Sequence, residues 1–237
     1  FTSTGIDDNA TSTAITIDAS EKVGIGTSSP AQKLTLDSGY VQVGNGTGGA
    51  GGVKYPYGGS ADTRNWRTRT DIASYGDWGI EQSTTKTGET YATKLLINPA
   101  GIVTKPNQPA FRVCKDTGDT TSTGYIVWNT AKINVGGHYS TSTGKFTAPV
   151  AGNYYFAVRA LTLSASQTNI WIGIDINGGS VLQTYHTHTN HSNISGEAVI
   201  TMAVNDYVQI YWGGTGGIHT ANTGHHKYTF FQGYLLG

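Results

Sequence analysis

The stretch from Tyr139 to Phe156, YSTSTGKFTAPVAGNYYF, decides how the second half of this chain folds. It joins two strand-like runs through Gly, Thr and Pro residues, which are common where a chain turns. Aromatic residues at Phe146 and from Tyr154 to Phe156 are separated by the small residues and proline of 148–152. This pattern predicts a tight corner between strands of a β-sandwich, a structural feature and not a catalytic one.

The composition favours the all-β class. The 237 residues include 33 Gly, 14 Tyr and one Met, and Thr and Ser are abundant, which suits short strands and turns rather than helices. Charged residues make up 13% and the formal net charge is zero, so there is no electrostatic footprint for a nucleic acid or an anionic membrane. No apolar run approaches the roughly 18 residues that span a bilayer. We therefore expect neither nucleic-acid binding nor membrane insertion.

The chain has a single cysteine and an unusual beginning. Cys114 forms no intrachain disulfide and follows Phe111 and Val113 in a strand-like run, so we expect a small buried hydrophobe. The opening residues FTSTGIDDN lack an initiator Met and the pattern of a signal peptide, which suggests a processed or excised piece.

The first part of the chain, residues 1–104, contains short strand signals. Ala14 to Ile17 and Lys33 to Leu36 alternate like strands, and the segment from Val23 to Pro30 is predicted to be a Gly- and Pro-containing turn region. The sequence VGIGTSSPAQKLTL resembles one that recurs in phage tail fibres and tailspikes and in some bacterial surface proteins. This resemblance implies a trimeric, β-structured shaft or collar.

A meander is predicted after Asn65. Trp66 and Trp78 lie on two short strands and Leu95 to Ile97 on a third, with turns at Tyr75-Gly76 and at Pro99 to Gly101. Three arginines near Trp66 suggest an acidic-sugar site, but solvated charges on a strand face are the commoner explanation; they are Arg64, Arg67 and Arg69.

One apparent motif in this region carries no chemistry. Gly44, Gly46 and Gly49 satisfy the dinucleotide pattern G-x-G-x-x-G, but no helical segment follows and no acidic residue stands at the ribose position. A glycine-rich chain matches this pattern by chance, so we interpret the segment as a loop.

A second domain, residues 105–237, is predicted to start at KPNQP, because its two prolines interrupt any strand ladder. Ile170, Ile172, Ile174 and Ile176 share one strand face, and Val208, Ile210 and Trp212 repeat the pattern with Tyr207 and Tyr211 opposite. Strands with two apolar faces suit a subunit that packs on copies of itself. The expected strands are 109–115, 124–128, 131–135, 154–163, 169–176, 180–186, 194–202, 206–212 and 227–236.

Six blocks of this domain resemble a known family. QPAF at 108–111, Tyr139, TGKFTAP at 143–149, GNYYF at 152–156, NDYVQI at 205–210 and FQGYLL at 231–236 are similar to the globular head of complement component 1q, in the tumour-necrosis-factor-like superfamily. The resemblance implies a ten-strand jelly-roll β-sandwich that forms a homotrimer. The matched residues belong to packing and turns, so no catalytic residue follows from them.

Strand order in such a sandwich predicts where the loops lie. The connections 164–168, 187–193 and 213–226 fall together at one end, and 177–179 and 203–205 fall at the opposite end. In the family the last strand ends beside the start of the first, so the resemblance implies that the first group lies at the end remote from the N-terminal part. Most of the histidines occupy or flank the first group. We therefore predict a receptor-binding surface at this distal end, made by Tyr185, His186, His188, His191, Trp212, His219, His225 and His226.

The histidines also allow a metal hypothesis. His186 and His188 lie on one face of an extended segment, and three chains about an axis would offer six nitrogens to an octahedral transition metal. The pair resembles histidines that bind iron on the axis of some phage fibre tips. The alternative is that these are exposed loop histidines with ordinary hydrogen bonds, since no Cys or carboxylate joins them.

No enzyme signature is present: the chain lacks G-x-S-x-G, H-E-x-x-H, a P-loop and an evident carboxylate pair. We predict a trimeric, extracellular virion appendage, a tail fibre or spike, that contacts other virion proteins through its N-terminal domain and a host glycan or protein through its head. The rival is a structural capsid decoration or tail collar protein. A secreted complement-like lectin is a third possibility, against which the VGIGTSSP block argues.

Overall fold

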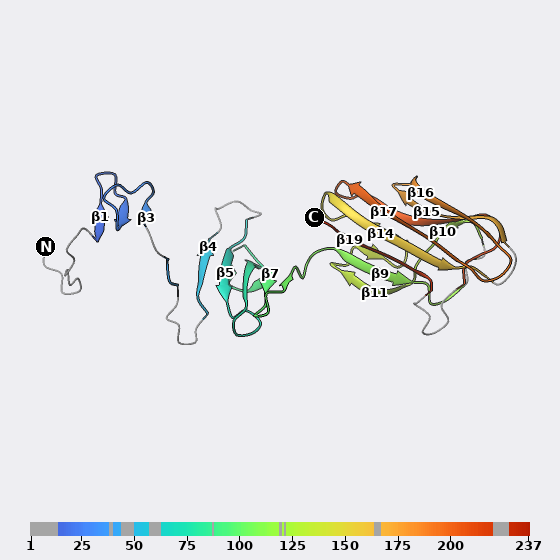
Figure 1. Cartoon of the computed structure of the whole chain (residues 1–237), viewed down its shortest axis with the longest axis horizontal. Coiled ribbons are helices and arrows are strands. Elements are labelled where there is room, and N and C mark those ends of the chain that lie inside the picture. Colours follow the sequence, from blue (N-terminus) through green and yellow to red (C-terminus); the bar gives the residue numbers. More distant parts are fainter. Residues whose placement is uncertain are drawn as a thin grey trace. The chain divides into compact units, whose positions relative to one another are not determined.

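In the computed structural model the chain consists of strands and loops, and it divides into two compact units between residues 92 and 101 (Figure 1). No helix occurs among the residues that the structure describes, and none of these residues forms a helix able to cross a membrane. The described residues are 14–37, 40–43, 50–56, 63–86, 88–118, 120, 122–163, 167–219 and 228–237.

The first strands form a three-stranded sheet. Its members are β1 (Ile15–Ile17), β2 (Val23–Ile25) and β3 (Leu34–Leu36). β2 pairs antiparallel with β1 and parallel with β3. The prediction that the whole segment from Val23 to Pro30 is a turn is therefore wrong for its first three residues, which form β2. Gly24 explains the error, because a Cβ at this position would lie 2.5 Å from the carbonyl oxygen of Thr27, so the glycine serves close packing within a strand.

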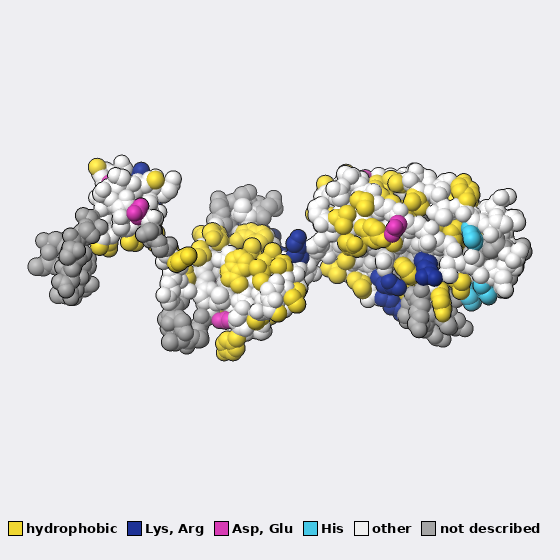
Figure 2. Space-filling model, in the orientation of Figure 1, with side chains coloured by type: hydrophobic (Ala, Val, Ile, Leu, Met, Phe, Trp, Pro, Cys, Tyr) yellow, Lys and Arg dark blue, Asp and Glu magenta, His cyan; other side chains and the backbone are white. Residues whose placement is uncertain are grey.

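The predicted meander is a five-stranded sheet, which we call the N-terminal sheet. Its strands are β4 (Gly52–Tyr55), β5 (Trp66–Thr70), β6 (Trp78–Ser83), β7 (Tyr91–Ile97) and β8 (Val103–Thr104), paired in sequence order. Before residue 105, the one buried apolar side chain in the described ranges is Pro30. Figure 2 shows hydrophobic side chains gathered on the visible surface of this sheet. Among the described residues, the sheet is therefore a single layer without an apolar core.

The head, from β9 onward, is a sandwich of two sheets, which confirms the all-β jelly roll. One sheet has the order β11-β9-β19-β14-β17, formed by Thr130–Val135, Ala110–Cys114, Phe230–Leu235, Gly152–Leu161 and Asn193–Met202. The other has the order β12-β13-β18-β15-β16, formed by Tyr139–Ser140, Lys145–Thr147, Tyr207–Gly213, Gln167–Ile176 and Gly179–His188. The short strand β10 (Gly124–Tyr125) pairs with β18, so the strand predicted at 124–128 is shorter than expected.

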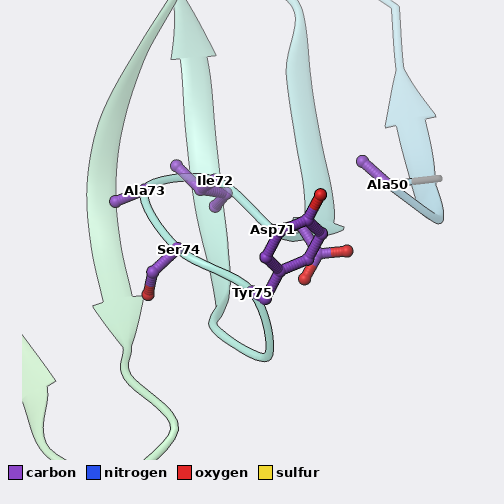
Figure 3. A pocket seen from close by; sticks show the side chains of 6 residues that line it. All are labelled: Ala50, Asp71, Ile72, Ala73, Ser74 and Tyr75. Atoms are coloured by element: carbon purple, nitrogen blue, oxygen red, sulfur yellow. The ribbon is translucent and has the colours of Figure 1, made fainter. Parts of the chain in front are cut away.

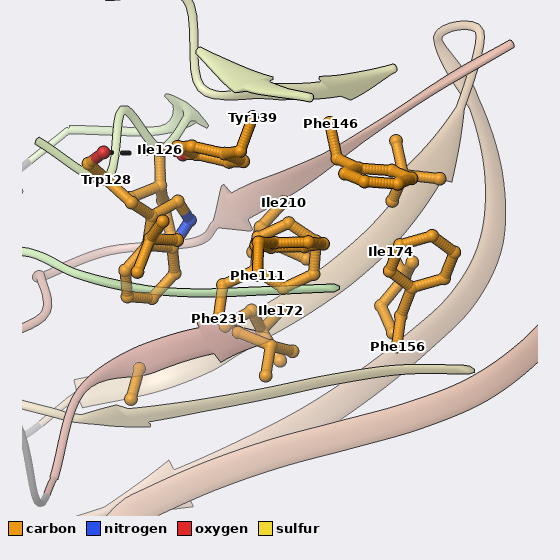
Figure 4. Packing of buried hydrophobic residues seen from close by; sticks show 14 of the residues in the cluster. Phe111, Ile126, Trp128, Tyr139, Phe146, Phe156, Ile172, Ile174, Ile210 and Phe231 are labelled. Atoms are coloured by element: carbon orange, nitrogen blue, oxygen red, sulfur yellow. Dashed lines mark hydrogen bonds between the residues drawn. The ribbon is translucent and has the colours of Figure 1, made fainter. Parts of the chain in front are cut away.

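The stretch from Tyr139 to Phe156 crosses from one sheet to the other and fills the space between them (Figure 4). Phe146 on β13 and Phe156 on β14 are both buried, with ring centroids 5.6 Å apart. Phe111 on β9 stacks on Phe146 at 4.8 Å and meets Phe231 on β19 edge-on at 4.8 Å. Burying each such ring contributes about 1.5–3 kcal/mol to folding. The predicted corner is confirmed, and its aromatic residues form the core.

Two long strands, β15 and β18, follow the alternation that their sequences predict. Ile170, Ile172 and Ile174 are fully buried against the core. β15 turns into β16 through Asn177 and Gly178, whose φ values of 51° and 83° are those of the tight turns that match strand twist. Cys114 is buried as expected, and burial, together with its hydrogen bond to Asp116, raises the pKa of its thiol to about 11.

Candidate functional site

Three connections meet at one end of the head, as predicted. The Thr162 N–H donates to the carbonyl of Ser192 at 2.8 Å, which joins the β14–β15 connection to the β16–β17 connection. The His219 N–H donates to Leu161 at 2.7 Å, which brings in the segment after β18. We call this region, residues 161–163, 186–192 and 214–219, the loop end.

Three histidines come together at the loop end. His191 Nδ1 lies 2.8 Å from the carbonyl oxygen of Thr162, and the His191 ring stacks on His219 with centroids 5.7 Å apart. His186 Nε2 lies 2.8 Å from the hydroxyl of Ser192. Figure 2 shows histidine side chains at this end of the head. These contacts link residues from three different connections into one surface.

The remaining predicted residues fall elsewhere. The backbone of His188 pairs with Gln167 at the end of β16, and its side chain lies outside the described part of the chain, as do His225 and His226 altogether. Tyr185 is 66% exposed on the outward face of β16, where its ring lies 6.2 Å from that of Trp171. It therefore belongs to the outer face of its sheet and not to the histidine cluster.

The prediction that Trp212 contacts a receptor is wrong. Its side chain is fully buried in the core, on the same face of β18 as Val208 and Ile210. Its indole N–H donates to the carbonyl of Gly216 at 3.4 Å. Because the strand alternates, Tyr211 faces outward instead. Trp212 therefore packs in the core below the loop end, and its side chain is not accessible to a receptor.

The metal hypothesis concerns three chains about one axis. Within one chain, the described side chains contain no group of three or more His, Cys, Asp or Glu that could hold a metal ion. His186 has a hydrogen-bond partner in Ser192. This arrangement fits the alternative explanation, loop histidines that bond to their own neighbours.

The opposite end of the head holds the other two turns, also as predicted. Asn177 Nδ2 donates to Asp206 at 2.7 Å, and this hydrogen bond lowers the pKa of the Asp206 carboxyl. The first and last strands also meet here, because Ala110 pairs with Tyr234. Within the head, the loop end is thus remote from the point where β9 begins.

A hollow of about 480 Å³ lies in the N-terminal unit, beside the β5–β6 turn (Figure 3). Its lining residues are Ala50, Asp71, Ile72, Ala73, Ser74 and Tyr75. The buried Asp77 carboxylate holds this turn by accepting backbone N–H bonds from Ile72, Ala73 and Ser74 at 2.6–2.8 Å. Burial opposes ionisation, but these three donors keep the pKa of Asp77 below its usual range. The Asp77 carboxylate therefore has a structural task, which is to hold the turn beside the hollow.

The arginines near Trp66 are engaged within the sheet. Arg67 Nε lies 2.7 Å from the buried Glu81 carboxylate, and its guanidinium lies 3.8 Å from the Tyr91 ring centroid. Arg69 lies 3.6 Å from the same carboxylate, and Arg64 donates to the carbonyl of Thr63. These contacts favour the structural explanation over an acidic-sugar site.

One group of surface residues was not predicted from the sequence. Strand alternation places Trp171 and Tyr211 on outward faces without assigning them to a site, and the structure brings their rings together at 4.9 Å. The alternation is a signal that could have found them, but the pairing register was needed to make them neighbours.

The head has the two-sheet jelly roll of the complement 1q and tumour-necrosis-factor class. Residues 110–236 match the C1q domain, and the chain belongs to the family of proteins that contain this domain. It is 27% identical over 131 residues to complement C1q tumor necrosis factor-related protein 3 of Mus musculus, covering 54% of this chain and 51% of the relative. It is 32% identical over 89 residues to complement C1q tumor necrosis factor-related protein 2 of Homo sapiens, covering 36% and 30%. The chain thus spans about half, or less, of the length of these curated relatives.

A solved structure is also similar to this chain. The globular domain of zebrafish complement 1qA protein aligns with 55% of this chain and 98% of its own, with 22% identity and a TM-score of 0.44. The family match covers the head, and the likeness of VGIGTSSPAQKLTL to phage fibre sequences stays a prediction.

Proposed function

We propose that this protein is a trimeric virion appendage, a tail fibre or spike, whose C1q head recognises a receptor on the host cell surface. In this proposal the N-terminal unit is the shaft or collar that joins other virion proteins. The head acts by binding alone, at the virion surface, and its ligand is a surface glycan, with a surface protein as the alternative.

One observation carries the proposal: three connections and three histidines converge at the loop end, remote from the start of β9. His191 is exposed, and His186 and His219 are partly exposed. Imidazole side chains offer both apolar area and hydrogen bonds, and loops held by a rigid sandwich are common binding sites. A shaft attached at the start of β9 would leave this end of the head accessible.

The N-terminal sheet supports the trimer. It exposes Val53 at 44%, Tyr55 at 54% and Trp66 at 38%, and no second layer covers it among the residues that the structure describes. A sheet must bury its apolar face against another element, which further copies of the chain would supply. C1q-like domains are trimeric, so the head would bring three such sheets together.

Three copies of a weak site would be enough for attachment. When one head has bound a repetitive surface, its neighbours bind at a high effective concentration, and the overall affinity exceeds that of one site by roughly 10²–10⁴-fold. An exposed loop surface suits this mode of binding.

The competing function is a purely structural virion protein, and the same exposed sheet favours it. Apolar side chains such as Tyr55 and Trp66 would also pack against neighbouring proteins of a capsid or collar. The two functions differ at the loop end, which is free in one and covered in the other.

Competition for adsorption tests the proposal. The purified chain is first weighed by analytical ultracentrifugation, where a trimer gives three times the 25.1 kDa chain mass. It is then added to host cells before the virus, and we expect dose-dependent inhibition of adsorption. The double variant His191→Ala/His219→Ala should lose most of this inhibition.

The matched control is His138→Ala. This histidine follows β11, whose last residue pairs with Ala110 at the opposite end of the head. The control should inhibit as well as the unchanged trimer. If the intact trimer does not compete, the structural function is correct, and if the chain is a monomer, the trimeric appendage is excluded.

A further inference from the structure

The outer face of the sheet β10-β18-β15-β16 carries a group of aromatic side chains far from one another in sequence. The Trp171 and Tyr211 rings are nearly parallel, with an interplanar angle of 13° and centroids 4.9 Å apart. Tyr185 flanks Trp171 at 6.2 Å, and Tyr125 meets Tyr211 edge-on at 5.1 Å. We call these four residues the aromatic platform. Tyr185 is 66% and Tyr125 41% exposed, and the two central rings are half-buried.

Two glycines fix the position of the Trp171 ring. A Cβ at Gly213, which pairs with Trp171 across β15 and β18, would lie 2.1 Å from Cε2 of the indole. A Cβ at Gly173 would lie 3.0 Å from its Cζ3. The indole therefore lies directly over the backbone of both strands. A ring held in this way loses little conformational entropy when a ligand stacks on it.

A carboxylate stands beside the rings. Asp175 is 6% exposed, and its Oδ2 accepts a hydrogen bond from the Tyr125 hydroxyl at 3.1 Å. Its Oδ1 is buried and has no hydrogen-bond partner among the described residues. This oxygen lies 3.3 Å from the Cβ position of Gly173, next to the edge of the indole. A buried acceptor without a donor is costly, and a ligand hydroxyl would satisfy it.

The charge of the platform selects the ligand chemistry. Asp175 adds negative charge. In the described part of the chain, the cations that lie over aromatic rings lie over rings outside the platform; Lys145 Nζ, for example, is 3.7 Å from the centroid of the Tyr207 ring. Phosphates, nucleic acids and acidic sugars are therefore disfavoured. A neutral pyranose offers an apolar C–H face for the electron-rich rings and hydroxyl donors at its edge.

We propose that the aromatic platform binds a neutral pyranose, which stacks on the outward ring face of the Trp171–Tyr211 pair and donates a hydroxyl hydrogen bond to Asp175. This site lies on the flank of the sandwich and shares only Tyr185 with the predicted receptor-binding residues. It does not depend on the loop-end function proposed above, because it uses none of the histidines.

Titration of the full-length chain with neutral oligosaccharides tests this site. The probes are cellohexaose, mannohexaose and chitohexaose, followed by tryptophan fluorescence and calorimetry, with trigalacturonic acid as the acidic comparison. We expect saturable binding of at least one neutral probe, with weaker binding of the acidic one. Trp171→Ala should weaken the binding at least about tenfold, as expected for loss of a stacking ring, and Trp171→Phe by less.

The controls separate this site from folding and from the loop end. Tyr228→Ala removes an exposed tyrosine at 41% exposure outside the platform and should leave binding unchanged. His191→Ala tests the loop end and should also leave it unchanged. If Trp171→Ala lowers the melting temperature, oligosaccharide binding by Tyr211→Ala provides a second test of the platform.

Three outcomes would overturn the proposal: saturable binding of no neutral probe, binding that survives both Trp171→Ala and Tyr211→Ala, or self-association beyond the trimer that Trp171→Ala abolishes. The last would assign the platform to a second copy of the chain.

Discussion

The head and the N-terminal unit are both made of β-sheets, and they differ in what their strands enclose. In the head, two sheets face each other across rings such as Phe111 and Phe156, which are almost completely buried. In and beside the N-terminal sheet, the buried side chains among the described residues are polar; they are Asn65, Asp77, Glu81 and Ser83. The number of layers, and not the strand content, therefore decides whether a region encloses a core within its own chain.

The largest effect is expected when the two regions are separated. Residues 105–237 should fold cooperatively, with a free energy of unfolding in the usual range of about 5–15 kcal/mol for a domain. Residues 1–104 should lack a cooperative transition as a monomer, because they bury too little apolar surface. Circular dichroism during urea titration checks both. A monomeric 1–104 fragment with a sharp transition would contradict the comparison.

Next in size is the loss of one core ring. Phe111→Ala should lower the free energy of unfolding of the head by about 3–5 kcal/mol, because the cavity borders four other rings. Urea denaturation measures this change. The control is Tyr75→Ala in the N-terminal unit, where the side chain is 86% exposed and the change should stay within about 0.5 kcal/mol.

A smaller effect is expected from the buried charge in the N-terminal sheet. Glu81→Ala should cost roughly 2 kcal/mol of local stability, less than for a fully buried pair, because the Arg67 side chain keeps 26% exposure. Amide hydrogen exchange along β5 and β6 measures it. The matched control is Glu89→Ala, whose ion pair with Lys54 is solvent-exposed and should leave exchange unchanged. Equal effects would show that ion pairing does not hold this sheet.

The smallest effect on stability is expected from the titration of Cys114 in the head. Burial raises its thiol pKa to about 11, so the neutral thiol should resist iodoacetamide at pH 8 in the folded chain and react fully in urea. Because the folded pKa lies above the ordinary 9.0, this contribution to stability is intact below pH 9 and is lost as pH rises towards 11. Rapid labelling at pH 8 would mean that the head opens readily.

Most of the head could be predicted from the sequence, because strands such as β15 show their alternation directly. The prediction for Trp212 is wrong because it weighs residue type above strand face, although the alternation puts this side chain beside Ile210 in the core. β2 is missed because its glycine resembles a turn signal. For the aromatic platform, alternation places Trp171 and Tyr211 on outward faces, but they become neighbours only through the pairing register of β15 with β18.

The first and last residues of the head domain lie side by side. Leu235 N–H donates to the carbonyl of Pro109 at 3.0 Å, and the Gln108 side chain donates to the carbonyl of Leu235 at 2.6 Å. A domain with adjacent ends can be exchanged between proteins as a cassette, because it enters and leaves its host chain at one point. A reporter fused after Gly237 would emerge beside Gln108, at the opposite end of the sandwich from the histidines. The same geometry suits circular permutation, with a short linker joining the present ends.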